Sequence, residues 1–233
     1  MIRTLTTAAA ATALLACATV AAAQDVAPAS GSWTFVVGAA TDNRSKAASK
    51  SDGDSFVWGE AEWESTSGLF YAGPSFETVK SSGSDLEVAL NAGVRPEFAG
   101  FDLDLNVKHK WLVDADPAAD ADAWEFTADV KRSIGPASGR VRLQYSPDST
   151  GATEAWTWVE ARLGWDFTEK LYASAAIGRR EQDNSVDYTG YDAGISYALT
   201  RSLEADLRWY GTDAEVPGEQ YADSLVAGLS LAF

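Results

Sequence analysis

The sequence predicts an all-β fold, an antiparallel transmembrane β-barrel of about 12 strands with short periplasmic turns and longer extracellular loops. Three observations support this prediction. Apolar and polar residues alternate with a period of two along the chain, the connections between these segments are alternately short and long, and the last segment ends on an aromatic residue, Phe233. Each observation is typical of barrels that cross a bacterial outer membrane.

The first 23 residues predict a secretory signal peptide that is cleaved from the mature chain. Arg3 supplies a positive charge, residues 5–20 are apolar and rich in alanine, and Ala21-Ala22-Ala23 offers a small-residue cleavage site. The apolar run is shorter than a membrane-spanning helix requires. Cleavage after Ala23 leaves a short N-terminal segment, 24–31, followed by a single barrel at 32–233.

Cys17 is the only cysteine and suggests a competing interpretation of this segment. With the preceding Leu14-Leu15-Ala16 it resembles a lipoprotein box, in which the cysteine becomes the lipidated first residue. Cleavage after Ala23 instead leaves a mature chain without cysteine, which excludes a disulfide or a thiolate metal site.

Alternation of apolar and polar side chains marks the predicted strands. From Leu86 to Val94 every second residue is apolar, while Glu87, Asn91 and Arg95 share the opposite face of the strand. No mature segment has a run of about 18 apolar residues, so helices are not expected to span the membrane. Strands are expected near 32–40, 55–65, 69–79, 86–95, 101–113, 122–132, 139–146, 155–167, 171–180, 188–199, 203–212 and 222–233.

The connections between these segments alternate in length. Short turns are expected at 66–68, 96–100, 134–138, 168–170 and 200–202, and longer polar loops at 41–54, 80–85, 114–121, 146–154, 181–187 and 213–221. Short turns at one end and long loops at the other follow the plan of outer-membrane barrels. An even strand number places both termini at the short-turn, periplasmic end.

Aromatic residues are expected in two belts at the membrane interfaces. On this topology one belt, near the periplasmic ends of the strands, contains Trp33, Trp63, Trp165, Phe167 and Phe233. The other belt, toward the outer ends, contains Trp111, Trp124, Trp156 or Trp158, and Trp209. The terminal Phe233 on an alternating strand also resembles the signal by which the barrel-assembly machinery recognises its substrates.

The polar faces of the strands are expected to line the interior of the barrel. The predicted lining residues are Glu60, Glu62, Glu64, Glu87, Asp102, Asp104, Lys108, Lys110, Glu125, Asp129, Lys131, Arg140, Arg142, Glu160, Arg162, Asp166, Arg180, Asp192, Glu204, Asp206 and Arg208. Charges of both signs either line a wet constriction and set ion selectivity, or pair across the interior and plug it. The acidic excess favours a mild preference for cations.

The overall charge excludes one class of partner. The chain has 34 acidic and 18 Lys or Arg residues, so it lacks the basic surface that nucleic-acid binding requires. The partners expected instead are outer-membrane lipid, the barrel-assembly machinery through Phe233, and ions or small solutes. The oligomeric state is left open.

Residues for catalysis or metal binding are scarce. The single histidine, His109, shares its predicted face with Val107 and Trp111, which points it toward lipid rather than toward a catalytic partner. A zinc site with several histidines is impossible. The acidic loops at 52–54 and 114–122 are expected to be solvated, with weak Ca²⁺ binding as an alternative. We therefore predict no catalytic residue, no metal and no cofactor.

The N-terminal third of the mature chain resembles the TorF family of porins. The resemblance is carried by Gly38-Ala39-Ala40-Thr41-Asp42-Asn43-Arg44-Ser45-Lys46, Ser49-Lys50-Ser51-Asp52-Gly53-Asp54 and Ser67-Gly68-Leu69-Phe70-Tyr71-Ala72-Gly73. Here Asp42-Asn43-Arg44-Ser45 replaces the more aromatic Tyr-Arg-x-Arg-Gly that is frequent in the family. The resemblance implies a small outer-membrane porin and no particular substrate.

These observations predict a passive channel for ions or small hydrophilic solutes in the bacterial outer membrane. One alternative is a closed structural barrel that presents its loops to partners. A second is a barrel enzyme that depends on His109. A third is a soluble β-sandwich or lipocalin-like barrel, which also shows a period of two but points its apolar face inward.

Overall fold

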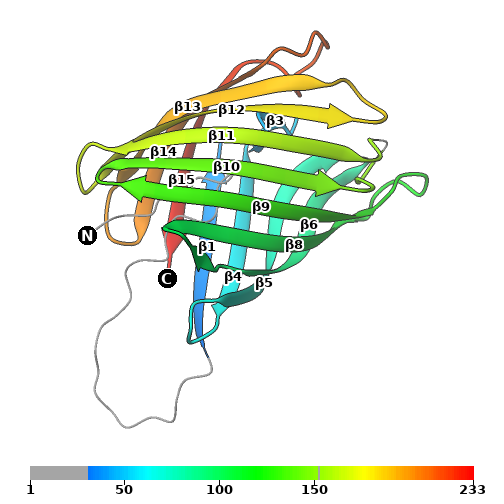
Figure 1. Ribbon diagram of the computed structural model, residues 1–233. Helices are drawn as coiled ribbons and strands as arrows, with labels where there is room; N and C mark the ends of the chain where they lie inside the picture. The colour runs from blue at the N-terminus through cyan, green and yellow to red at the C-terminus, as the bar shows by residue number, and fades with distance from the viewer. Residues whose placement is uncertain (1–30, 152) are drawn as a thin grey trace.

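The computed structural model describes residues 31–151 and 153–233, which form a closed antiparallel β-barrel without helices (Figure 1). Twelve long strands form the ring: β1 (Ser32–Ala40), β4 (Phe56–Glu64), β5 (Phe70–Ser81), β6 (Ser84–Val94), β8 (Phe101–Val113), β9 (Asp122–Ile134), β10 (Ala137–Ser146), β11 (Trp156–Asp166), β12 (Leu171–Gln182), β13 (Tyr188–Ala198), β14 (Leu203–Thr212) and β15 (Ser224–Ala232). The predicted signal peptide, Cys17 and nearly all of segment 24–31 lie outside the described residues.

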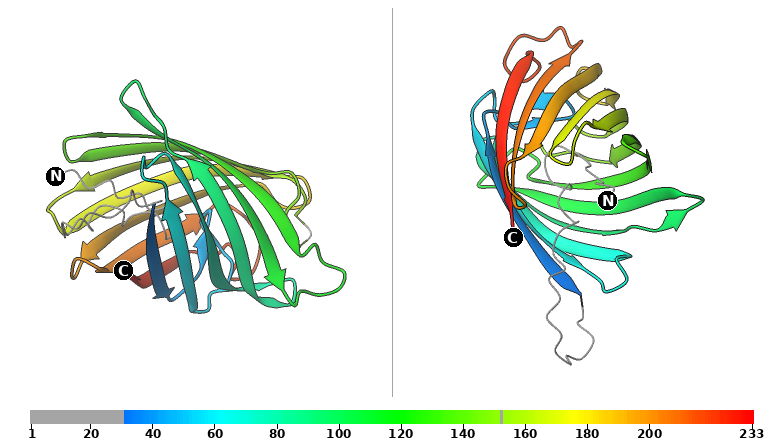
Figure 2. Two further views of the ribbon diagram at one scale, coloured as in Figure 1. Left: turned by 90° about the horizontal axis from the view of Figure 1, so that it is seen from below. Right: turned by 90° about the vertical axis from the view of Figure 1, so that its left-hand side faces the viewer.

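Each long strand pairs with the next long strand along the chain, and one further pairing closes the ring. The first strand, β1, pairs with the last, β15, so that Val36 lies opposite Ala232. Strand β6 pairs directly with β8, while β7 (Glu97–Phe98) is a short extension paired with the start of β8. Figure 2 shows the ring from two further directions, with β1 beside β15.

The predicted fold class is confirmed. All 12 predicted segments coincide with strands of the ring, with boundaries that agree within two residues. Closure explains this regularity, because it satisfies the backbone hydrogen-bonding groups of every strand and leaves no open sheet edge.

The connections define two ends of the barrel, named here the turn end and the loop end. The turn end holds both termini of the ring and the connections 65–69, 95–100, 135–136, 167–170 and 199–202. The loop end holds 41–55, 82–83, 114–121, 147–155, 183–187 and 213–223. The prediction of a long loop at 80–85 was wrong, because β5 and β6 continue to a two-residue turn. Ser82 and Gly83 there both have positive φ, the geometry that suits a tight hairpin.

The outer surface of the ring is apolar. Large exposed side chains such as Leu90, Val141, Leu163, Ile177 and Leu225 point away from the interior. Apolar side chains exposed on the outside of a ring are typical of barrels that cross a membrane.

Aromatic residues gather on this outer surface near both ends. At the turn end, the Phe35 ring stacks between Trp33 and the terminal Phe233, with ring centroids 6.1 and 5.8 Å away respectively. Trp124 and Trp209 are exposed near the loop end. Trp156 and Trp158 do not belong to the outer belt, because each is only 2% exposed and lies inside the barrel. They share the inward face of β11 with Glu160 and Arg162.

Candidate functional site

The interior of the barrel is the candidate functional site, because charged side chains gather there. Of the predicted lining residues, Glu87, Asp104, Lys110, Glu125, Asp129, Arg140, Glu160, Arg162, Asp192 and Arg208 are buried. Glu60, Glu62, Glu64, Lys108, Lys131, Arg142, Asp166, Arg180, Glu204 and Asp206 are half-buried, and Asp102 is exposed. The inward positions of β1 and β15 carry no charge, so the charge lies on the remaining wall.

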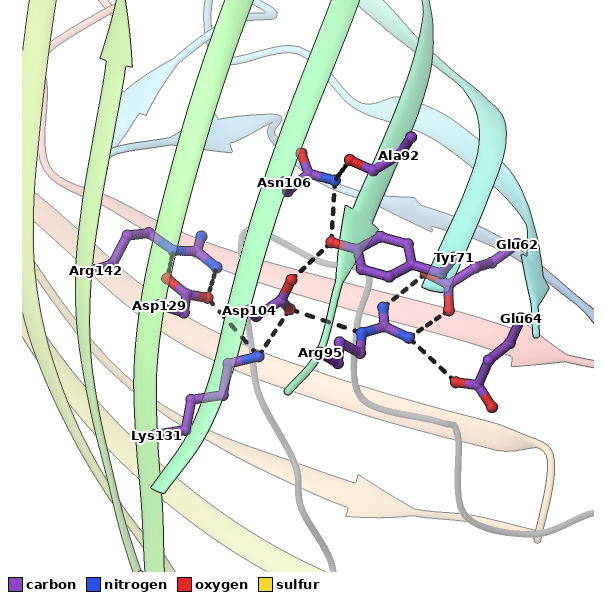
Figure 3. A network of polar contacts seen from close by, with 10 residues as sticks. All are labelled: Glu62, Glu64, Tyr71, Ala92, Arg95, Asp104, Asn106, Asp129, Lys131 and Arg142. Atoms are coloured by element: carbon purple, nitrogen blue, oxygen red, sulfur yellow. Dashed lines mark hydrogen bonds and ion pairs between the residues drawn. The ribbon is translucent and has the colours of Figure 1, made fainter. Parts of the chain in front are cut away.

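One charged network joins β4, β5, β6, β8 and β9 in the turn-end half of the interior (Figure 3). Arg95 donates from both terminal nitrogens to the Glu62 carboxylate, at 2.7 and 2.8 Å, and reaches Glu64 at 3.3 Å. Its guanidinium carbon lies 3.7 Å from the centroid of the Tyr71 ring. The Tyr71 hydroxyl donates in turn to Asp104 at 2.7 Å. Bidentate and stacked contacts of this kind hold an arginine in one orientation.

A second set of ion pairs lines the wall formed by β9 to β14. Arg142 donates to both oxygens of Asp129, each at 2.7 Å, from the neighbouring strand. Asp192 accepts bonds from Arg162 at 2.6 and 2.8 Å and from Arg208 at 2.5 Å. The Asp129 and Asp192 carboxylates thus accept hydrogen bonds from arginines of other strands, and these bonds hold the side chains against the wall.

The connection between β1 and β4 folds into the barrel instead of extending away from it. This connection, residues 41–55, is named here the inward segment, and it contains the short hairpin of β2 (Arg44–Ser45) and β3 (Ala48–Ser49). Figure 1 shows β3 behind the strands of the front wall at the loop end. Asp42, Asn43 and most of the hairpin are buried. The segment therefore narrows the barrel at this end.

Buried polar contacts hold the inward segment together. The Asp42 carboxylate accepts bonds from Ser49 Oγ at 2.6 Å and Ser51 Oγ at 3.0 Å, and also pairs with Arg44. Arg44 donates onward to the carbonyl oxygens of Ala47, at 3.2 Å, and Ala222, at 2.8 Å. The second of these bonds ties the segment to the connection between β14 and β15.

The inward segment also contacts opposite walls. On one side Lys50 pairs with Glu77 and, at 2.9 Å, with Glu87. On the other side the Tyr188 hydroxyl donates to the Lys46 carbonyl oxygen at 3.0 Å. Gly190 makes this approach possible, since an added Cβ there would lie 2.7 Å from Ala47 Cβ. The segment thus joins β5 and β6 to β13 across the interior.

Replacing Asp42 by alanine is expected to loosen the inward segment, because Ser49, Ser51 and Arg44 all lose their shared acceptor. Trypsin cleavage after Arg44, Lys46 or Lys50 in the detergent-solubilised protein should speed up about tenfold. Asp54→Ala is the matched control, since Asp54 is exposed and pairs only with the exposed Lys80 among the described residues. Equal cleavage rates in the two variants would contradict the role given to Asp42.

Arg44, Lys46 and Lys50 are interior residues that the predicted lining set did not include. They lie in a connection without alternation, so the period-two pattern gives no signal for them. The one available signal was the resemblance of residues 38–54 to a family motif, which marked the segment without assigning it a position.

His109 lies on the outer surface near the loop end, where its ring stacks on Trp124 with centroids 4.2 Å apart. Its Nε2 atom lies 2.7 Å from the Asp122 carboxylate. In residues 31–151 and 153–233, no group of three or more His, Cys, Asp or Glu side chains is arranged to hold a metal ion.

A family model described as a bacterial protein of unknown function (Gcw_chp) matches residues 25–228. The chain belongs to this family. The match does not confirm the resemblance to the TorF family, which stays a prediction. No curated protein is similar enough to the chain to count as a match.

Solved structures of outer-membrane proteins share the fold of this Gcw_chp chain. A KdgM porin aligns with a TM-score of 0.61 at 6% identity, covering 86% of this chain and 99% of the porin. A NanC porin aligns at 0.58 with 7% identity, covering 87% and 99%. An outer-membrane channel from Pseudomonas putida F1 aligns at 0.54 with 10% identity, covering 88% and 96%. At these identities the likeness shows the fold alone, a barrel of the porin type.

Proposed function

We propose that the protein is an outer-membrane channel for the passive diffusion of ions and small hydrophilic solutes. The observation that carries the proposal is a charged interior, narrowed by the inward segment, inside a ring whose outer surface is apolar. A 12-stranded ring has a backbone diameter of about 24 Å, because strands lie about 4.8 Å apart and tilt by roughly 40°. Lining side chains reduce this to an opening for small solutes.

The similar structures support this proposal through their architecture. The proteins sharing the fold are named as porins and as an outer-membrane channel, and one KdgM porin is described in complex with disordered oligogalacturonate. We infer from the shared fold that lipid of the bacterial outer membrane surrounds the apolar surface. We also propose that Phe233, exposed at the end of β15, is the residue through which the assembly machinery recognises the barrel.

Ion pairing decides how far the acidic excess controls selectivity. The inward segment brings three cationic side chains into the interior, those of Arg44, Lys46 and Lys50, but only one buried carboxylate, Asp42. It therefore reduces the excess of negative charge in the interior. The wall nevertheless keeps Asp102, an exposed carboxylate that forms no ion pair with a described residue. We therefore expect a weak preference for cations, with potassium favoured over chloride about twofold.

The test is the single-channel conductance of the refolded, detergent-purified protein in a planar bilayer. Discrete current steps, with a reversal potential in a salt gradient that favours potassium, are the expected result. A protein that inserts without conducting would contradict the proposal. It would favour a closed structural barrel, the alternative in which the dense ion pairs plug the interior. Steps that favour chloride would overturn the assigned selectivity while leaving the channel in place.

A further inference from the structure

Two cations in the loop-end half of the interior lack a carboxylate partner. Lys46 Nζ lies 4.2 Å from the centroid of the Trp156 ring, and the Arg180 guanidinium carbon lies 4.7 Å from the same ring. Among the described residues, no carboxylate oxygen lies within ion-pair distance of either side chain. Lys46 Nζ makes one hydrogen-bond contact, with Ser45 Oγ at 3.5 Å.

Buried donors without partners lie at the same place. Trp156 is 2% exposed, and its Nε1–H has no hydrogen-bond acceptor among the described residues. The Arg180 Nε–H is also buried without an acceptor. A buried donor without an acceptor is costly, so such groups are typically satisfied by a ligand or by ordered water.

The cations around this place are already paired. Lys50 contacts Glu77 and Glu87, and Lys110 contacts Glu125 at 2.5 Å. The ion pairs thus consume the nearby carboxylates and leave Lys46 and Arg180 with a surplus of positive charge. The surplus is local, in an interior whose overall balance is acidic.

We propose that Lys46, Trp156 and Arg180 form a binding site for the carboxylate of a small organic acid. This rests on the proposed function, since the solute must enter the barrel to reach the site. A carboxylate offers only acceptors, and this site offers only donors: an ammonium, a guanidinium and an indole N–H. The neighbouring Trp158 and Tyr221 belong to the same apolar cluster as Trp156, so the body of the acid meets an apolar surface.

The environment of Lys46 makes binding depend on pH. The pKa of Lys46 is lowered to about 7, mainly by burial; Glu125 opposes this lowering, and Arg180, Lys110 and Lys50 contribute to it. The Tyr188 hydroxyl also packs against Lys46, donating a hydrogen bond to its backbone carbonyl oxygen. Lys46 is therefore charged below about pH 7 and neutral above it. Affinity for an anion should fall about tenfold between roughly pH 6 and pH 8.5.

Benzoate is the probe, and benzyl alcohol is its neutral counterpart. Titration calorimetry on the detergent-solubilised protein at about pH 6 measures binding without requiring a current. We expect benzoate to bind and benzyl alcohol not to bind. Lys46→Met and Arg180→Gln should each weaken benzoate binding about tenfold, and Trp156→Phe, which keeps a ring but removes the N–H, about threefold.

The control is Lys80→Met, which removes the same charge from an exposed position at the loop end. Equal weakening in Lys80→Met and Lys46→Met would overturn the site, since it would show only a general effect of net charge. Tighter binding of inorganic phosphate than of benzoate would overturn the assignment to carboxylates. Absence of benzoate binding in a protein that conducts would overturn this inference alone, whereas binding without conductance would contradict the proposed function.

Discussion

Replacing the inward segment by a two-residue turn is expected to raise the single-channel conductance about threefold. Ala40 and Phe56 are direct cross-strand partners, so an Asn-Gly turn can join β1 to β4 in place of residues 41–55. The replacement removes the hairpin of β2 and β3 from the interior, while the strands of the ring keep their pairing. Conductance follows the narrowest cross-section, and the inward segment fills part of the interior at the loop end.

The control for this replacement shortens the connection between β8 and β9. Residues 114–120 are mostly exposed and do not enter the interior, so replacing them by Gly-Ser-Gly should leave the conductance unchanged. Thermal unfolding in detergent checks that both variants form the barrel. An unchanged conductance without the inward segment would show that the narrowest point lies elsewhere, among the ion pairs of the wall.

The ring itself could be predicted from the sequence because each strand turns one face toward the charged interior and the other toward the apolar outer surface, so its residues have to alternate. The inward face of β11 shows that alternation places side chains correctly, and that one placement was wrong because it ignored the alternation. Trp156, Trp158, Glu160 and Arg162 share one parity, and that parity alone places the two tryptophans inside. Assigning one of them to the outer belt followed the general preference of tryptophan for interfaces, and the local pattern prevailed.

The inward segment could not be predicted from the sequence, because its position depends on contacts between distant residues. Arg44 bonds to the carbonyl of Ala222, 178 positions away, and Lys46 meets Tyr188, 142 positions away. A polar connection of this composition is equally compatible with an extended loop in water. Contacts with residues of the wall, such as Gly190 on β13, are what stabilise the segment inside the barrel.

The pairing of charges also required the strand register. Arg142 lies directly opposite Asp129, which the sequence alone does not fix. Arg140 lies directly opposite Arg162, a like-charged pair that alternation would not anticipate. Glu160 resolves this repulsion, since Arg140 approaches it at 2.5 Å and Arg162 at 3.5 Å. Residue type and face could be predicted, whereas the partner of each charge could not.

Replacing Asp192 by asparagine is expected to lower the free energy of unfolding by about 3 kcal/mol. Asp192 is the shared acceptor of Arg162 and Arg208, whose side chains are only 9% and 2% exposed. The substitution keeps the size of the side chain but removes the negative charge nearest to two buried guanidinium groups, which retain only the longer contacts of Arg162 with Glu160, at 3.5 Å, and of Arg208 with Asp206, at 3.4 Å. Denaturant unfolding of the protein in detergent or lipid vesicles measures the change.

Arg179→Gln provides the matched comparison, because Arg179 pairs with Asp187 at 3.9 Å and both side chains are about half exposed. An exposed pair of this kind contributes less than about 1 kcal/mol. A loss of stability at Asp192 as small as the loss at Arg179 would contradict the buried environment of Asp192, Arg162 and Arg208. It would mean that water reaches both arginines, and that the charged wall between β11 and β14 is part of the open path rather than of its packed lining.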